Sequence, residues 1–425
     1  MKRKAKSDKK NKTSGLTRIS LKGYKSIAKK CSIEIRPITI LSGANSSGKS
    51  SIMQPLLLMK QTLDSFSEPG VLKINGPHVY FTKMNQIFSR NQGSKTAGNS
   101  FEIEMEEGDV SIKNVFSLDA KGHMKLKAMN YRNSKHSYKL TASTKEEDLL
   151  KILPELFFYF VKESNWNSSV GVVRRRCFYD IEVLSSDGSA SRPSSIPLGD
   201  YKSFADSVSE MIHLPALRGN PERSYSAVPV SRQGSPGVFN DYIAGTIKDW
   251  QDNDRKKIKL LINNLREIGM ADRIVVEAIN DTEVSLKVGR YLSSKKKDDL
   301  VDIADVGFGI SQILPILVAL ITAKPGQLVY IEQPEIHLHP KAQNELVQQF
   351  IEAANRGVRM VIETHSDILI SALQDMIKQE KLNPGDVSLN WFQIDKDGST
   401  AVKEARLDQK GDYKGWPEDF CGKNG

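Results

Sequence analysis

The sequence has few cysteines and no long apolar run. These two features argue against a disulfide-bonded protein and against a membrane protein. Its three cysteines, Cys31, Cys177 and Cys421, lie far apart among 425 residues and fit no zinc or redox spacing. An odd number of cysteines in an otherwise ordinary composition favours a reducing compartment over a disulfide framework. No apolar stretch approaches the roughly 20 residues that a membrane-spanning helix needs. We therefore expect a cytoplasmic protein with no membrane partner.

Basic residues exceed acidic ones, and the excess is concentrated at the N-terminus. The formal net charge is +10, and residues 1–14 contain seven basic side chains and one acid, Asp8. We predict a disordered basic tail over residues 1–15, and such a tail binds phosphates by releasing counterions. Nucleic acid is therefore one candidate partner. Solubility, or contact with another protein, would account for the same composition.

A phosphate-binding loop is predicted at Gly43–Ser50. The segment reads GANSSGKS and fits the pattern G-x-x-x-x-G-K-[ST] between a strand-like run and a helix-like run. Backbone N–H groups of the loop and of the helix start would hold the β- and γ-phosphates of ATP. Lys49 would neutralise these phosphates, and the Ser50 hydroxyl would ligate Mg²⁺. The predicted nucleotide-binding residues of this loop are Gly43, Asn45, Ser46, Ser47, Gly48, Lys49, Ser50 and Ser51.

Three later segments follow the loop: ADVGFGISQ at 304–312, LVYIEQPEIHLHP at 328–340 and VIETHSD at 361–367. An apolar strand that ends in a carboxylate places that oxygen beside the phosphate loop in this class of sheet. Glu332 is therefore the predicted Mg²⁺ ligand. Gly309 and Ser311 precede an apolar helix-like run, and exposed N–H groups and a hydroxyl at a helix start suit an incoming γ-phosphate.

The order of the four segments resembles the ABC-type ATPase heads of the SMC, RecF and OLD (overcoming lysogenization defect) groups. The resemblance implies an α/β fold, namely a P-loop ATPase head of two lobes with mixed sheets flanked by helices. In these families the second segment is a signature motif that reaches the γ-phosphate held by a partner protomer. His365 resembles their switch histidine. Two protomers would then enclose ATP in a head-to-head dimer, or assemble further.

One position departs from the pattern of these families. The residue after the metal-binding acid is usually a glutamate that acts as general base, and here it is Gln333. An amide can orient a water but has no basic lone pair for its proton, so hydrolysis of ATP to ADP and phosphate should be slow. Three explanations stay open: a natural variant that holds ATP, an engineered block of hydrolysis, or another base. For another base, the candidates are Glu335 and His365.

The chain divides into a tail and three larger parts. Residues 16–120 alternate like strands, contain the phosphate loop and form the predicted first lobe. Residues 121–270 lack head motifs and contain two helix-like segments, at 146–162 and 241–270, without sustained heptads, so we predict a mostly helical insertion rather than a long coiled coil. Arg218 and Arg223 in this part either face a nucleotide or partner, or form structural ion pairs. Residues 271–425 form the predicted second lobe with the other three segments and a C-terminal tail.

Relatives with this layout look like the ATPase subunits of bacterial anti-phage loci such as Septu, which work with a separate nuclease or toxin. The resemblance implies an ATP-binding sensor or scaffold that hydrolyses slowly and controls such an effector. The alternative is a RecF-like repair clamp, which would bind DNA in a salt-sensitive way and more tightly with ATP. A direct nuclease is least expected, because the sequence shows no complete cluster of metal-binding carboxylates.

Overall fold

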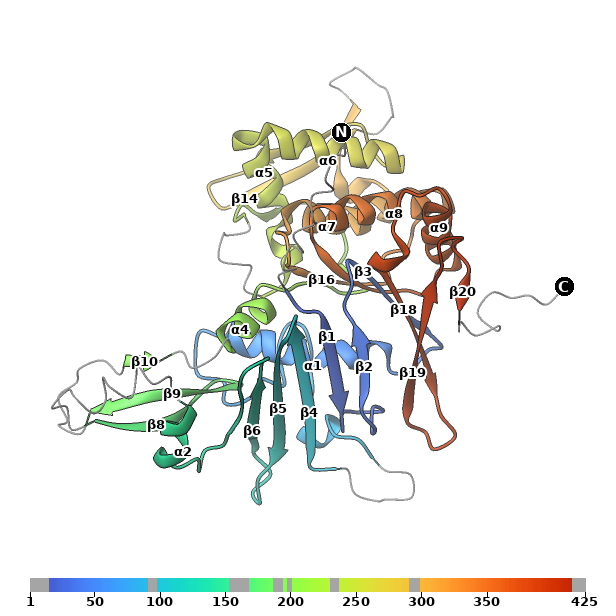
Figure 1. The fold of residues 1–425 in the computed structure, drawn as a ribbon. Coiled ribbons are helices and arrows are strands. Elements are labelled where there is room, and N and C mark those ends of the chain that lie inside the picture. Colours follow the sequence, from blue (N-terminus) through green and yellow to red (C-terminus); the bar gives the residue numbers. More distant parts are fainter. Residues whose placement is uncertain are drawn as a thin grey trace, which may run out of the picture.

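The computed structural model describes residues 15–90, 98–152, 168–185, 194–196, 201–229, 237–289 and 299–414, which form sheets with helices packed on them (Figure 1). Two predictions fall largely outside these residues. They are the basic tail, of which residues 1–14 are not described, and the helix predicted over 146–162, which is described only as α2 (Glu146–Ile152).

A seven-stranded sheet, the central sheet, has the order β11-β16-β17-β3-β18-β19-β20. In this order, the strands from β11 to β18 pair in parallel. β19 pairs antiparallel with β18, and β20 pairs antiparallel with β19. Because parallel strands are covered on both faces, they read as continuous apolar runs. Along the sheet, the strands are β11 (Ile212–Leu214), β16 (Leu328–Glu332), β17 (Arg359–Glu363), β3 (Ile38–Gly43), β18 (Val387–Ile394), β19 (Thr400–Leu407) and β20 (Tyr413–Lys414).

The two faces of the central sheet belong to two hydrophobic cores. Alternate residues of β3 show the division, since Ile38 and Ile40 pack into one core and Leu41 into the other. The first core contains helices on one face of the sheet (Figure 1): α7 (Phe308–Thr322), α8 (Pro340–Asn355), α9 (Asp367–Lys378), α5 (Ile243–Asn253) and α6 (Arg255–Ile268). The second core contains α1 (Lys49–Leu63). Among the described residues, no helix combines the length and apolarity needed to cross a bilayer.

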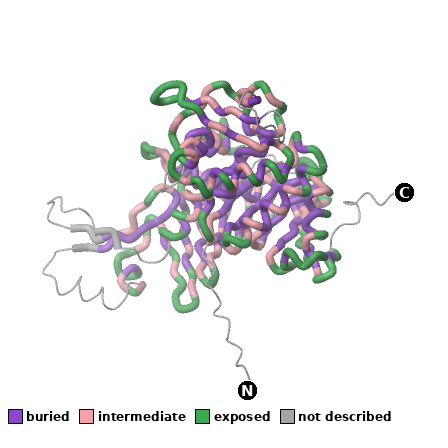
Figure 2. Tube along the Cα trace, turned by 90° about the horizontal axis from the view of Figure 1, so that it is seen from above, coloured by how far each residue is buried: buried purple, intermediate pink, exposed green. Residues whose placement is uncertain are grey.

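An outer sheet of six antiparallel strands, in the order β2-β1-β4-β5-β6-β7, completes the second core. Alternate residues of β4, Phe101, Ile103 and Met105, are buried, as expected for a sheet with one covered face. Figure 2 shows that buried residues gather in the middle of the molecule and exposed ones mainly at its periphery. The strands are β2 (Cys31–Glu34), β1 (Arg18–Lys22), β4 (Ser100–Glu107), β5 (Val110–Leu118), β6 (Met124–Arg132) and β7 (Ser137–Leu140). The lobe boundary predicted at residue 120 therefore cuts through this sheet.

The part predicted as a mostly helical insertion is a mixture of strands and helices. Besides β6 and β7, it contains the hairpin β8 (Ser168–Arg175) and β9 (Phe178–Ser185) with β10 (Ser194–Ile196), which projects from the body (Figure 1). The valine-rich and aromatic runs of this hairpin are typical of strands and outweigh the helix-like segments around them. Helix α4 (Tyr201–Ser209) then leads to β11 in the central sheet.

The helix predicted over 241–270 begins near the expected place but is interrupted. It consists of the 3₁₀ turn η2 (Phe239–Tyr242), α5 and α6, and the Asp254 side chain caps α6 by accepting from Lys256 N and Lys257 N. α5 and α6 pack in the first core with a small sheet of β12 (Tyr225–Ser226), β13 (Ile274–Ala278), β14 (Glu283–Gly289) and β15 (Leu300–Asp302). Other 3₁₀ turns are η1 (Met84–Gln86), η4 (Ile303–Asp305) and η5 (Pro384–Asp386).

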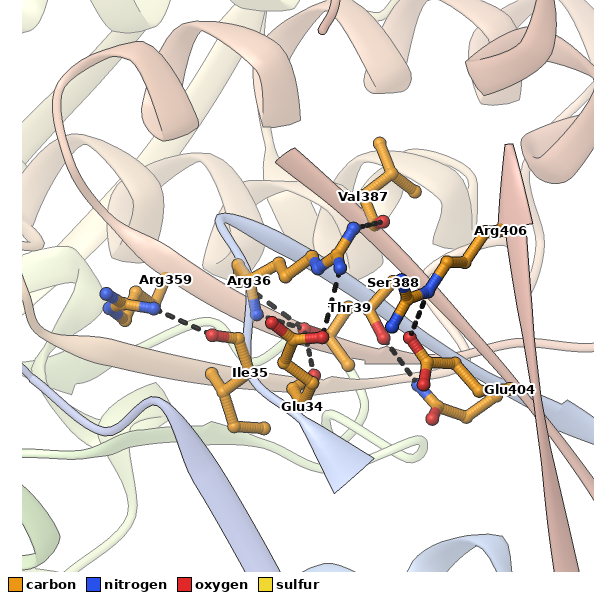
Figure 3. Close-up of polar contacts among 10 residues, drawn as sticks. Glu34, Ile35, Arg36, Thr39, Arg359, Val387, Ser388, Glu404 and Arg406 are labelled. Atoms are coloured by element: carbon orange, nitrogen blue, oxygen red, sulfur yellow. Dashed lines mark hydrogen bonds and ion pairs between the residues drawn. The ribbon is translucent and has the colours of Figure 1, made fainter. Parts of the chain in front are cut away.

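Arginine side chains hold strand ends together at the amino edge of the central sheet, where the parallel strands begin (Figure 3). Arg36 Nη1 donates to the Val387 carbonyl at 3.0 Å, and its Nη2 donates to Glu34 Oε2 at 3.0 Å. Arg359 Nη1 donates to the Ile35 carbonyl at 2.7 Å. These bonds connect the segment between β2 and β3 to the first residues of β17 and β18, and so help to fix the positions of the strand starts.

Candidate nucleotide-binding site

The predicted phosphate loop joins β3 to α1 at the opposite, carboxyl edge of the central sheet. Gly43 and Gly48 have φ angles of 141° and 99°, in the left-handed region. A Cβ on Gly43 would lie 2.1 Å from the Phe392 carbonyl oxygen, and one on Gly48 would lie 2.4 Å from Thr400 Oγ1. Both positions therefore require glycine, because the loop packs closely on β18 and β19.

Lys49 is the first residue of α1 and folds back over the loop. Its Nζ donates to the Gly43 carbonyl at 3.0 Å and to the Ala44 carbonyl at 2.8 Å. Burial lowers the pKa of Lys49, and the nearby Glu363 carboxylate opposes this shift. The ammonium group is therefore buried with neutral carbonyl partners, and a phosphate would supply the anion it lacks.

The remaining loop residues provide donors that suit phosphate oxygens. Asn45 and Ser46 are exposed, and Ser51 N donates to the Gly48 carbonyl at 3.1 Å. Ser47 Oγ is buried without a partner among the described residues. No side chain in the described part of the chain caps the start of α1. Open N–H groups at a helix start, with a lysine beside them, fit a phosphate group.

Ser50 meets a carboxylate from β17. Its Oγ donates to Glu363 Oε1 at 3.0 Å, and Tyr330 OH donates to Glu363 Oε2 at 3.0 Å. Burial raises the pKa of Glu363, against the opposing hydrogen bond from Ser50. Glu363 is absent from the residues predicted by sequence, although it lies in the quoted segment VIETHSD. Like Glu332 it ends an apolar strand, so the same reasoning would have identified it.

Glu332, the predicted Mg²⁺ ligand, ends the neighbouring strand β16 and lies opposite Glu363 in the register. Its Oε1 lies 3.2 Å from His213 Nε2, and its Oε2 accepts from Ala216 N at 3.3 Å. Burial raises the pKa of Glu332, but the bonds from His213 and Ala216 outweigh this effect, and the net shift is downward. Glu332 thus lies one strand farther from the loop than Glu363, with both oxygens bonded to β11 and the segment after it, and its role as a Mg²⁺ ligand stays a prediction.

His213 is a second residue that the sequence analysis did not assign to the site. Its ring stacks on Tyr330 with the centroids 5.2 Å apart, and its Nδ1 lies 3.1 Å from His78 Nδ1. Burial lowers the pKa of His78 to about 3, helped by His213 and Lys60. His213 stands five residues before Arg218 in the sequence, but nothing in that segment indicates that β11 would pair with β16.

The three predicted catalytic residues lie at the same edge. Gln333 has a left-handed φ of 44°, and its N–H donates to the Glu363 carbonyl at 2.7 Å. His365 N donates to Glu335 Oε1 at 2.9 Å. Burial lowers the pKa of His365, and Lys49 lowers it further, so its imidazole is neutral at pH 7. The structure therefore brings Gln333, Glu335 and His365 together with the loop, and their catalytic roles stay predictions.

The two arginines considered in the sequence analysis, Arg218 and Arg223, differ in their surroundings. Arg223 forms an exposed ion pair with Asp305, with N–O distances of 2.7 and 3.1 Å. Arg218 is buried, and its Nη2 donates to the Glu332 carbonyl at 2.6 Å. Burial lowers the pKa of Arg218 to about 10, and Glu335 and Glu332 oppose that shift. Arg218 thus supports the end of β16, whereas Arg223 is paired at the surface.

The signature residues form a second group at the start of α7. Ser311 Oγ donates to the Phe308 carbonyl at 2.8 Å, and the Phe308 side chain is 50% exposed. A Cβ on Gly309 would lie 3.4 Å from the His337 carbonyl oxygen, so this group packs beside the segment after β16. Whether Gly309 and Ser311 meet the nucleotide of a second copy stays a prediction.

Comparisons with known proteins agree with this geometry. Residues 15–216 match the family model described as "AAA ATPase domain", and residues 177–371 match the one described as "AAA domain, putative AbiEii toxin, Type IV TA system". The Old nuclease of Escherichia phage P2 is 22% identical over 304 residues, which are 62% of this chain and 48% of that protein. The chain thus spans about half the length of this curated relative.

A solved structure shows the same fold. The SMC head bound to the C-winged helix domain of ScpA superposes with a TM-score of 0.50 at 13% identity, covering 93% of this chain and 98% of that one. Likeness at this identity concerns the fold alone. The phosphate loop and these matches support an ATPase of the AAA/ABC type that is similar to the Old nuclease and has the fold of an SMC head.

Proposed function

We propose that the chain is a nucleotide switch. It binds ATP with Mg²⁺, closes head to head on a second copy, hydrolyses the nucleotide slowly, and in this way controls a separate nuclease or toxin in bacterial anti-phage defence. The observation that carries the slow step is Gln333 at the end of β16.

The loop residues perform the binding step. The phosphates would draw Lys49 from its backbone carbonyls, since a phosphate oxygen carries a negative charge that a carbonyl oxygen lacks. Ser50 and the strand-end carboxylates would hold Mg²⁺, which when bound neutralises charge on the β- and γ-phosphates. The open start of α1 and the buried Ser47 hydroxyl supply further donors.

The hydrolytic step lacks a strong base where the family places one. The Gln333 backbone is anchored by its bond to the Glu363 carbonyl, so its amide replaces the usual carboxylate at a fixed position. Of the other candidates, Glu335 accepts the His365 N–H through Oε1, and His365 is neutral at pH 7. Each would act from a place the family does not use, so we assign Gln333 the orientation of water and expect little deprotonation.

A second copy would complete each site. α7 starts at an exposed phenylalanine, Phe308, and no side chain of the described residues caps its first turn. Its N–H groups are thus open to an anion from outside the chain. This arrangement supports a head-to-head dimer in which the nucleotide joins the two copies, and further assembly would build on that dimer.

The effector chemistry is assigned to another protein. In the anti-phage loci that the sequence resembles, a separate nuclease or toxin performs this step. One matching family model also carries the description of a putative toxin of a toxin–antitoxin system, which supports a role in defence.

The first test combines three measurements on the purified chain: ATP binding, single-turnover hydrolysis, and mass with and without Mg·ATP. We expect tight binding, turnover that takes many minutes, and a doubling of mass with Mg·ATP. Fast turnover, or an unchanged mass with bound nucleotide, would contradict the switch. Salt-sensitive DNA binding that tightens with ATP would support the repair clamp instead.

A further inference from the structure

Two carboxylates, those of Glu332 and Glu363, end the neighbouring strands β16 and β17, and they have different hydrogen-bond partners. Glu332 is bonded through both oxygens to protein groups outside the loop, namely His213 and the Ala216 N–H. Glu363 is bonded to Ser50, the loop residue whose hydroxyl is expected to ligate Mg²⁺. The carboxylate with an oxygen already at the expected metal position is therefore that of Glu363.

The spacing of the two oxygens suits one metal ion. Mg²⁺ binds six oxygens in an octahedron at about 2.0–2.1 Å, so neighbouring ligand oxygens stand about 2.9 Å apart. Ser50 Oγ and Glu363 Oε1 are 3.0 Å apart. The Ser50 hydroxyl donates its proton to Glu363, so the lone pairs of Ser50 Oγ remain available to a metal ion. The pair thus needs little rearrangement to become two adjacent ligands.

Tyr330 fixes the orientation of this carboxylate. Its hydroxyl, on the fully buried side chain of β16, donates to Glu363 Oε2 at 3.0 Å. One oxygen is thereby held and the other is left towards Ser50. Ligands of metal ions are commonly held by such outer hydrogen bonds, and loss of these bonds lowers metal affinity about tenfold to a hundredfold.

We propose that Glu363 is a ligand of the Mg²⁺ ion that accompanies ATP, adjacent to Ser50 in the coordination shell and oriented by Tyr330. The inference rests on the proposed binding of Mg·ATP and adds a residue to that site. Mg²⁺ is usually held by one or two carboxylates together with phosphates and water, so Glu363 needs no larger cluster around it.

The test measures how much Mg²⁺ slows the release of a fluorescent ATP analogue. Release is followed by chasing with excess ATP, in EDTA and in Mg²⁺, and the ratio of the two rates reports the contribution of the metal. For Glu363→Gln we expect this ratio to fall about tenfold or more, with release in EDTA close to that of the wild type. Glutamine keeps the size, can accept from one of the two hydroxyl groups through Oε1 and can donate to the other through Nε2, so the fold should be retained.

Two further variants make the result specific. Tyr330→Phe removes the orienting hydroxyl and should lower the ratio less than Glu363→Gln does. Glu277→Gln makes the same change at an exposed residue of β13 and should keep the wild-type ratio. A wild-type ratio in both Glu363→Gln and Tyr330→Phe would overturn the assignment of Glu363. Absence of analogue binding by the wild-type chain in both conditions would overturn the proposed function as well, so the two failures are distinguishable.

Discussion

The two edges of the central sheet are formed by the same strands but use polar groups in opposite ways. At the amino edge, Arg36 and Arg359 donate to backbone carbonyls of neighbouring strand ends (Figure 3). At the carboxyl edge, Gln333 and His337 have left-handed φ angles of 44° and 63°. There the buried Glu335 Oε2 has no hydrogen-bond partner among the described residues.

This contrast indicates that the carboxyl edge serves ligand binding and that the amino edge serves stability. Strained backbone and unsatisfied buried groups lower stability, and proteins keep them mainly where a ligand or a reaction depends on them. The satisfied arginines of the amino edge can be explained by stability alone. Substitutions at the two edges should therefore separate two quantities, nucleotide affinity and the free energy of unfolding.

The largest effect is expected at the carboxyl edge, for Lys49→Ala. The variant loses charge-assisted bonds to phosphate worth about 1.5–3 kcal/mol each, so ATP affinity should fall about a hundredfold or more. Equilibrium binding of a fluorescent ATP analogue measures this change, and circular dichroism confirms the fold. Wild-type affinity in a folded Lys49→Ala chain would contradict the assignment of the loop.

The next effect concerns the missing base. Gln333→Glu restores a carboxylate at the end of β16, and general-base catalysis typically contributes a hundredfold or more, so single-turnover hydrolysis should speed up at least about tenfold. The φ of 44° is equally unfavourable for either residue, so stability should change little. An unchanged rate would show that closure limits the reaction or that another base acts.

The amino edge should respond in stability rather than in binding. Arg359→Met removes the bond to the Ile35 carbonyl and should lower the free energy of unfolding by about 2 kcal/mol in urea titrations. Arg406→Met is the matched control, because Arg406 forms an exposed pair with Glu404 that is worth about 0–1 kcal/mol. A loss of ATP affinity in folded Arg359→Met would contradict the idea that the amino edge contributes to stability and not to nucleotide binding.

The smallest effect is a pH dependence near the carboxyl edge. His78 has an ordinary pKa of 6.5 when unfolded and about 3 when folded, so the unfolded chain binds its proton first as the pH falls. The stability from neutral His78 is present above pH 6.5 and is lost progressively towards pH 3. His78→Gln should therefore flatten the decline in stability between pH 6.5 and 5, measured by urea unfolding. The exposed His136→Gln serves as control, and a parallel decline in wild type and His78→Gln would refute the assignment.

The sequence predicted those residues of the site that can be recognised from a short segment of the chain. The phosphate loop needs only consecutive residues with glycines at fixed places, and Glu332 was found because it ends an apolar run. Glu363 also ends an apolar run and could have been found in the same way. His213, in contrast, reaches Glu332 only because β11 pairs with β16, and no short segment encodes that pairing.

The sequence likewise predicted the ATPase head but not the structure of the insertion. The four ordered segments identified an ABC-type head, and the structural comparison confirms it. The insertion was misjudged because the helix-like 146–162 and 241–270 segments were weighed more than the valine-rich hairpin between them. Strand propensity depends on cross-strand neighbours, so a hairpin outside the main sheets is hard to identify from one sequence.

The position of β3 in the central sheet also determines when the site forms during synthesis. β3 lies between β17 and β18, and both partners follow it by more than 300 residues in the chain. During synthesis on the ribosome, β3 and its phosphate loop therefore have no strand to pair with in the central sheet until β17 and β18 have been made. Such exposed strands are prone to aggregate. The earliest motif in the sequence is thus among the last to take its working shape.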